Sequence, residues 1–451
     1  MGTSEPNMQF QRLVRETGWT LRQCAQAINR VGTERGTPKQ YRAPSVHQWL
    51  NGGMPRDDVR PLILEALARQ LGRPITLTDV GFPDSAKETE ETEASSPGIS
   101  GGLVDLGRMD MDPSRRSVLG VALFSVALTI PNWTDVVGRM EAVQQGNRTR
   151  VGMPDVHTVS AMTERLSSMD DQFGGRTARP LAATFLVNTV APFLRMDGPE
   201  TVRKAMMSAA SDLCYLTGYM AVDEGLHGLA QRYYLKALQL AGASEDHLTY
   251  CTTLRGMSVQ AVDLRHGPTA KRLADAAAAA SPQAGPRMRA FLAGQQAHAA
   301  AQVGDRRAAR RYLKEAETAM DKAESAGRAF GSYDPASLSY HTAQVRFEMG
   351  DVHGAVAAMQ ESDRKRYDVY RRTRVKERAI LAERQLAVGH LEAACETWGL
   401  ALNDYPLVQS GRIDQRMTTM MSLIAPHVRN HDAQALYERA RDVIRPDLIP
   451  H

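Results

Sequence analysis

The chain has 451 residues, more than a single compact core usually organises, so we expect two or three units or one extended array. Hydrophobic residues make up 43% of it but aromatic residues only 6%, and alanine, leucine, arginine and methionine recur in long stretches, which favours helices over sheets. The four cysteines show no CxxC spacing, which argues against a zinc site or a disulfide framework. The composition predicts an all-α protein with buried free thiols.

The formal charge of +4 is unevenly distributed along the chain. Residues 1–82 carry 11 Lys and Arg against 7 Asp and Glu, whereas residues 83–112 carry 2 against 8. A basic head followed by an acidic tether fits a nucleic-acid-binding module that is not trapped by its own linker.

The first predicted unit, residues 8–82, consists of four or five short helices. Phe10 and Leu13 belong to the apolar stripe of the first helix, and Thr20 caps a second helix. A third helix runs from about residue 43 to 50, with Trp49 facing inward. Its outer face carries polar side chains of the kind that read base edges in a DNA major groove, namely Ser45, His47, Gln48 and Asn51. The alternative interpretation of these four residues is a solvated helix face.

Three segments of this unit, "TLRQCAQAIN", "SVHQWLNG" and "ALARQLGRPITLTDVGF", resemble the lambda-repressor-like (XRE) helix-turn-helix family. The last segment is also similar to actinomycete regulators of differentiation and antibiotic production. The resemblance covers the first 82 residues and implies a helix-turn-helix bundle whose partner is double-stranded DNA.

The resemblance also implies a role for individual residues. Thr20 and Gln23 would contact phosphates, Ser45, His47 and Gln48 would face bases, with Asn51 beside them, and Arg56 would reach the DNA backbone. The loop "GTERGTPKQYRAPS" is longer than the tight turn of the family. It brings three more candidates for phosphate contacts, which would make DNA affinity strongly salt-dependent: Lys39, Tyr41 and Arg42.

A flexible acidic linker is predicted for residues 83–112, followed by an apolar helix and connector over residues 113–150. Arg115 and Arg116 precede the most hydrophobic run of the chain, which ends at Ile130, and together they resemble a twin-arginine export signal. The run has 13 residues, short of the ~20 that span a bilayer. We therefore expect a helix that docks onto the following domain, no membrane association and a cytoplasmic location. Export is the open alternative.

Residues 151–451 show a repeat with a period of about forty residues. The loop positions are Gly225, Gly267, Gly304, Gly350, Gly389 and Asn430, and an alanine follows most of them after five residues, at Ala230, Ala309, Ala355, Ala394 and Ala435. Ala394, Trp398 and Ala401 place small, large and small side chains on one helix face. The pattern resembles tetratricopeptide (TPR) repeats over roughly residues 199–444, which implies a C-terminal TPR-like α-solenoid.

The first helix of each pair should line the concave groove of such a solenoid. The repeat register predicts seven groove-facing residues suited to an extended peptide: Tyr215, Tyr219, His298, Tyr340, Gln344, Lys376 and Glu383. The charged stretch "RKRYDVYRRTRVKER", residues 364–378, is interpreted as a solvated helix face, with anion binding as the alternative. The sequence has no P-loop, HExxH or nucleophile-elbow motif, so we expect no enzyme activity, no cofactor and no metal.

The combination of a helix-turn-helix head with TPR-like repeats resembles the peptide-responsive regulators of bacterial quorum sensing. It implies a homodimeric transcriptional regulator that senses a peptide, a small molecule or a protein partner. The alternative function is a TPR-type scaffold that sequesters a protein partner without sequence-specific DNA binding.

Overall fold

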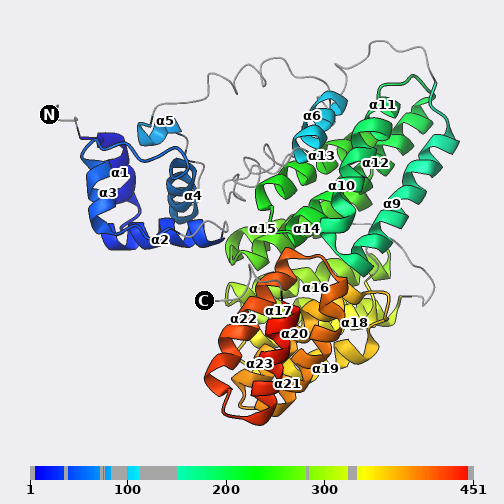
Figure 1. Ribbon diagram of the computed structural model, residues 1–451. Coiled ribbons are helices and arrows are strands. Elements are labelled where there is room, and N and C mark those ends of the chain that lie inside the picture. The colour runs from blue at the N-terminus through cyan, green and yellow to red at the C-terminus, as the bar shows by residue number, and fades with distance from the viewer. Residues whose placement is uncertain are drawn as a thin grey trace.

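The computed structural model describes residues 6–34, 39–71, 75, 77–82, 99–111, 150–280, 284–323 and 333–444. These residues form helices, short turns and one isolated bridge between Arg150 and Asp197, which confirms the predicted all-α class. Figure 1 shows a small N-terminal helical unit beside a larger array of stacked helices. In the described part of the chain, every helix is too short or too polar to span a membrane.

The N-terminal unit, which we call the head, has its own hydrophobic core. Its helices are α1 (Met8–Glu16), α2 (Leu21–Glu34), α3 (Ala43–Leu50), α4 (Arg60–Leu71) and α5 (Leu77–Val80). The Asn7 side chain accepts a hydrogen bond from the Phe10 amide and donates to the Val80 carbonyl, so it caps α1 and ties the end of the head to its beginning. Phe10 also packs edge-on against Phe82, with ring centroids 5.6 Å apart.

Helix α6 (Ile99–Met111) corrects the predicted linker, because residues 99–111 are folded. Leu103 and Leu106 are buried in the core of the large array, and α6 packs against α10 (Gly175–Phe185) and α13 (His227–Ser244). Asp110 pairs with Arg179 and accepts a hydrogen bond of 2.9 Å from the Tyr233 hydroxyl. The acidic composition of residues 83–112 outweighed the apolar stripe of Leu103 and Leu106 in the prediction of a linker. The apolar helix expected over residues 113–150 lies outside the described residues, apart from Arg150.

The large array begins with α9 (Met153–Phe173), α10, a π-helical turn (Leu186–Val190) and α11 (Ala191–Phe193). Six antiparallel helix pairs follow: α12 (Glu200–Asp223) with α13, α14 (His247–Asp263) with α15 (Gly267–Ala279), α16 (Pro286–Gln302) with α17 (Arg306–Asp321), α18 (Pro335–Glu348) with α19 (Val352–Lys365), α20 (Arg371–Ala387) with α21 (Leu391–Asp404), and α22 (Gly411–Ile424) with α23 (His431–Val443). The pairs stack in the solenoid-like order that the repeats predict (Figure 1).

Left-handed backbone at the turns explains the repeated glycines. Gly225, Gly304, Gly350 and Gly389 all have positive φ angles, between 77° and 88°. In the second pair the equivalent position is Arg265, with φ 61°, and Gly267 instead begins α15. Five residues after Arg265 comes the buried Ala270, so the alanine missing after Gly267 is present in the true register.

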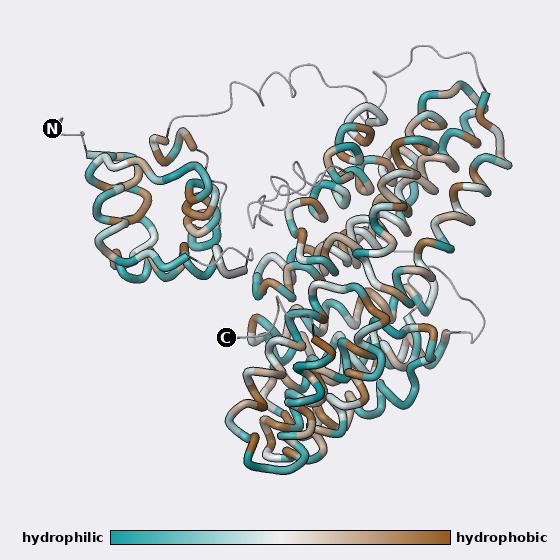
Figure 2. The backbone as a smooth tube through the Cα atoms, in the orientation of Figure 1, coloured by the Kyte–Doolittle hydropathy of each residue, from teal (hydrophilic) through white to brown (hydrophobic). Residues whose placement is uncertain are grey.

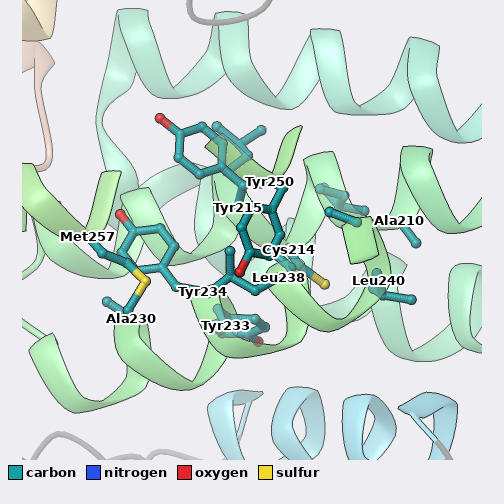
Figure 3. Close-up of a cluster of buried hydrophobic side chains, with 14 of the residues drawn as sticks. Ala210, Cys214, Tyr215, Ala230, Tyr233, Tyr234, Leu238, Leu240, Tyr250 and Met257 are labelled. Carbon is teal, nitrogen blue, oxygen red and sulfur yellow. The ribbon is translucent and has the colours of Figure 1, made fainter. Parts of the chain in front are cut away.

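The packing of small and large side chains agrees with the sequence pattern in most pairs. Ala230, Tyr234 and Ala237 are fully buried, and Figure 3 shows Tyr234 beside Ala230 and Met257. Gly218 on α12 allows this close approach, because a Cβ atom there would lie 2.9 Å from the Tyr234 ring. The last repeat departs from the prediction: Ala435 is exposed, and Ala433 is buried in its place. Asn430 caps α23 with its side chain, which shifts the register of that helix.

The solenoid closes on itself, because α9 packs against both α12 and α20. Backbone hydrogen bonds join the same regions: the Gln409 amide donates to the Phe173 carbonyl at 2.7 Å, and the Arg176 amide donates to the Gln409 carbonyl at 3.2 Å. Figure 2 shows hydrophobic and hydrophilic residues alternating along the helices of the array. The contact of α9 with α20 therefore narrows the concave surface that an open solenoid would leave accessible.

Candidate functional site

Helix α3 presents the polar side chains that the sequence predicts on its outer face. His47, Gln48 and Asn51 are exposed and Ser45 is half-buried. The opposite face is anchored in the head by Val46 and Trp49. The Asn51 amide nitrogen lies 3.2 Å from the His47 ring and donates to the His47 carbonyl at 3.0 Å, so these two side chains order each other at the end of the helix.

Thr20 and Gln23 form a capping box at the start of α2. The Thr20 amide donates to the Gln23 side-chain oxygen at 2.9 Å, and the Gln23 amide donates to the Thr20 hydroxyl at 3.3 Å. Both residues are exposed, as are Arg42 and Arg56. These four predicted positions are open to solvent.

Lys39 and Tyr41 have structural partners within the head. Lys39 forms an ion pair of 2.8 Å with Asp58. The Tyr41 ring packs edge-on against Trp49 at 5.0 Å, and the Asn29 side chain makes two hydrogen bonds of 2.8 Å to the Tyr41 backbone. The long loop after α2 is therefore tied to α2 and α3 at Tyr41, which fixes where α3 begins.

A pocket of about 420 Å³ lies inside the closed solenoid. Its wall comes from the inner helices α9, α12, α14, α16, α18 and α20 and from the segments that precede α18 and α20. Four of the seven predicted groove residues line it, namely Tyr215, Tyr219, Tyr340 and Lys376. The repeat register thus identified the helices that face inward.

The other three predicted groove residues lie outside the lining. His298 is buried, with its ring centroid 6.4 Å from that of His341. Gln344 accepts a hydrogen bond of 2.6 Å from Arg384, and Glu383 accepts one of 2.6 Å from Arg416. These side chains contact neighbouring helices, and Gln344 and Glu383 lie on the same helix faces as Tyr340 and Lys376 but one and two turns further along their helices.

The interpretation of residues 364–378 as a solvated face is wrong for its central residues. Arg372 and Glu377 are each 3% exposed, and Arg378 is also buried. Arg366 bonds Glu377 at 2.9 Å, and both side chains line the pocket. The charges turn inward because their partners lie on other elements, which no local pattern in the sequence reveals.

Buried ion pairs hold the closure of the solenoid. Arg372 on α20 contacts Asp170 on α9 at 2.8 Å and Asp223 on α12 at 3.4 Å. Arg412 on α22 contacts Asp223 at 3.4 Å and Asp263 on α14 at 2.8 Å. This cluster, which we call the closure network, joins the five helices α9, α12, α14, α20 and α22, and its Arg372–Asp170 pair spans 202 positions of the chain.

Two of the three aspartates that contact Arg372, Asp170 and Asp223, have pKa values shifted in opposite directions. Burial raises the pKa of Asp170 to about 7, with Arg372 opposing the shift. Burial also acts on Asp223, but Arg372 and Arg412 together outweigh it and lower the pKa of that carboxyl. Asp223 is therefore the charged acid at the centre of the closure network.

Arg255 and Lys376 differ from the other pocket cations, because no carboxylate of the described residues lies within 4 Å of either. The Arg255 guanidinium stacks on the Phe291 ring at 4.0 Å, and its Nε is buried without a hydrogen bond within the described structure. The Lys376 ammonium lies 5.3 Å from the centre of the Tyr340 ring. These two cations thus border the pocket without an ion pair within 4 Å among the described residues, although Lys376 acts electrostatically on Glu377 and Asp263.

Tyr219 lies where these cations meet the closure network. Burial raises its pKa, but Arg412, Arg372, Lys376 and Arg255 outweigh burial and lower the pKa to about 8. Arg372 and Arg412 lie 5.4 and 5.6 Å from the centre of its ring. Tyr219 itself therefore lies in a positive electrostatic environment.

We expect the buried histidines to make the domain acid-sensitive. Burial lowers the pKa of His298 to about 4, against about 6.5 in an unfolded chain, so below pH 6.5 the unfolded state binds more protons than the folded state. Stability is then lost as pH falls from 6.5 towards 4. Urea unfolding at pH 7 and at pH 5 measures the effect. Between these two pH values, the free energy of unfolding of His298→Asn should fall by about 2 kcal/mol less than that of the unsubstituted protein.

The exposed His157 supplies the control for this prediction. His157→Asn should leave the pH dependence of unfolding unchanged. Equal losses between pH 7 and pH 5 in the unsubstituted protein and in His298→Asn would contradict the assignment of the proton uptake to His298.

The N-terminal part of the chain matches a family model of known proteins. A family model described as the SP15 N-terminal domain matches residues 10–83, which coincide with the head. No curated protein matches the chain.

Proposed function

We propose that the chain is a DNA-binding transcriptional regulator with an XRE-like helix-turn-helix head and a TPR-like sensor domain. The observation that carries the proposal is the outer face of α3, where His47, Gln48 and Asn51 are exposed on a helix anchored by Trp49. The basic balance of residues 1–82 and the exposed Arg42 and Arg56 support it, since cations beside a reading helix bind phosphates.

The match of a family model to residues 10–83 supports the same division of the chain. A head with its own core recurs as a unit, so we propose residues 1–82 as the DNA-binding domain and residues 151–451 as the sensor domain. The pocket inside the solenoid is the proposed sensing site. We further propose a homodimer, because two tethered heads gain useful affinity from paired half-sites.

The test is selection from a random duplex DNA library by the intact protein. We expect enrichment of an inverted repeat. His47→Ala with Gln48→Ala should abolish that sequence preference and leave salt-dependent, non-specific binding, because base contacts specify while phosphate contacts supply affinity.

The exposed Arg12 on α1 provides a matched control. Arg12→Ala should enrich the same repeat as the intact protein. Enrichment of that repeat by the double variant would overturn the role of α3, and a lack of enrichment by the intact protein would favour the scaffold that sequesters a protein partner.

A further inference from the structure

The shape of the pocket argues against an extended peptide as its occupant. A peptide in an open solenoid lies along a groove that continues past both ends of the ligand. Here α9 packs against α20 and interrupts such a groove on that side, and the closure network holds the two helices together. The remaining volume of about 420 Å³ lies within the range typical of small-molecule sites.

The pocket wall suits a flat ring. Six aromatic side chains from α12, α16, α18 and the adjoining turns face it, namely Tyr215, Tyr219, Phe291, Tyr333, Tyr340 and Tyr370. The Tyr215 and Tyr219 rings lie 6.4 Å apart, and the Phe291 and Tyr333 rings 5.7 Å apart. At these separations the rings pack against one another, and the ring surface that faces the pocket can stack on a flat ligand.

Five carboxylates and four cations line the pocket, so only cations without a paired carboxylate can favour an anion. Asp170 and Asp171 contact Arg372, and Asp334 and Glu377 contact Arg366, so these carboxylates are already partnered. Arg255 and Lys376 form no ion pair within 4 Å among the described residues, although Lys376 acts electrostatically on Glu377 and Asp263.

Both cations line the same pocket, together with Tyr219 and His341. An anion placed there would meet two cations in a partly dehydrated site, where charge-assisted hydrogen bonds are strongest.

We infer that the pocket binds one small aromatic anion, a ring system bearing a carboxylate, sulfonate or phosphate, with the anionic group between Arg255 and Lys376. This inference rests on the sensor role given to the pocket in the proposed function. The ring lies against the tyrosine and Phe291 surfaces, and the anion satisfies the cations that no carboxylate of the wall neutralises.

The probe is 8-anilinonaphthalene-1-sulfonate, an aromatic anion, titrated into the full chain and followed by its fluorescence. The neutral analogue N-phenyl-1-naphthylamine reports on ring binding without the charge. We expect saturable 1:1 binding of the sulfonate. Arg255→Gln and Lys376→Gln should each weaken it about tenfold or more, because each removes one charge-assisted contact. Binding of the neutral analogue should change less than twofold.

Two further variants keep the test decisive. Lys376→Arg preserves the charge and should bind the sulfonate within a few-fold of the unsubstituted protein, which separates charge from packing if Arg255→Gln fails to fold. Lys314→Gln removes an exposed cation from α17 and should change nothing. Equal sulfonate affinity in Lys376→Gln, or equal losses for the two probes, would overturn the inference.

Competition distinguishes a free small molecule from the carboxyl end of a peptide. N-acetyl-phenylalanine should displace the sulfonate, whereas an acetylated pentapeptide ending in phenylalanine should not. Tighter competition by the pentapeptide would overturn the assignment to a small molecule. The DNA selection described above is independent of these titrations, so failure of the ligand assignment and failure of the proposed function are separately visible.

Discussion

Replacing Arg372 with Gln is expected to lower the free energy of unfolding of the solenoid by about 3–5 kcal/mol, the range for breaking a buried ion pair from one side. Arg372 is 3% exposed and joins Asp170 to Asp223. Without it, Asp223 keeps Arg412 and the Gly175 amide as partners, and Asp170 loses its guanidinium donor in a dry interface. Urea denaturation followed by circular dichroism measures the change.

Arg374, two residues further along α20, provides a matched control. It pairs with Asp368, whose side chain is 95% exposed, so Arg374→Gln should cost about 1 kcal/mol or less. Because the Gln409 backbone also ties α9 to the start of α22, we expect Arg372→Gln to loosen the closure without dissociating these helices completely. Equal stability losses in the two variants would show that the closure network does not hold the solenoid closed.

Replacing Trp398 with Ala is expected to destabilise the C-terminal helix pairs by about 3–5 kcal/mol, the usual cost of deleting a buried aromatic side chain. Trp398 is fully buried in a core that includes Ala394 and Met417. Trp398→Phe should cost about 1–2 kcal/mol, from lost apolar area alone, because the indole nitrogen has no hydrogen-bond partner within the described structure. Thermal and urea unfolding of the three proteins measure both values.

The control for this core is Leu400 on the same helix, which is 41% exposed. Leu400→Ala should change stability by less than about 1 kcal/mol. A second unfolding transition that appears only in Trp398→Ala would place the destabilisation in the last two helix pairs, since stacked repeats contact mainly their neighbours. A loss in Trp398→Ala no greater than that in Leu400→Ala would contradict the assignment of Trp398 to the core.

The repeat register was predictable because its causes are local. A turn between antiparallel helices needs left-handed backbone, which glycine adopts readily, and Gly304 and Gly350 therefore mark their turns in the sequence. Arg265 takes the same conformation with a side chain, so the second turn was assigned two residues too late at Gly267. The same local logic failed at Ala435, where the cap of Asn430 sets the register of the last helix.

The linker prediction failed at α6 because composition outweighed a short apolar stripe. Residues 83–112 are acidic as a whole, yet Leu103 and Leu106 find a buried surface on the solenoid. Asp110 adds to the acidic count, and the structure pairs it with Arg179, on a helix whose position no local signal indicates.

The sequence by itself determined the all-helical class, the position of α3 with Trp49 inward, and which helices of the array face inward, since each follows from periodicities of a few residues. Only the tertiary structure decided which charges are buried. Arg372 meets Asp170 across 202 positions of the chain because the curvature of the stacked helices brings α20 back to α9. That curvature results from many small rotations between neighbouring helix pairs. The ion pairs of Arg372, and the positions of Arg255 and Lys376 without an ion pair, are therefore set only when the whole array is folded.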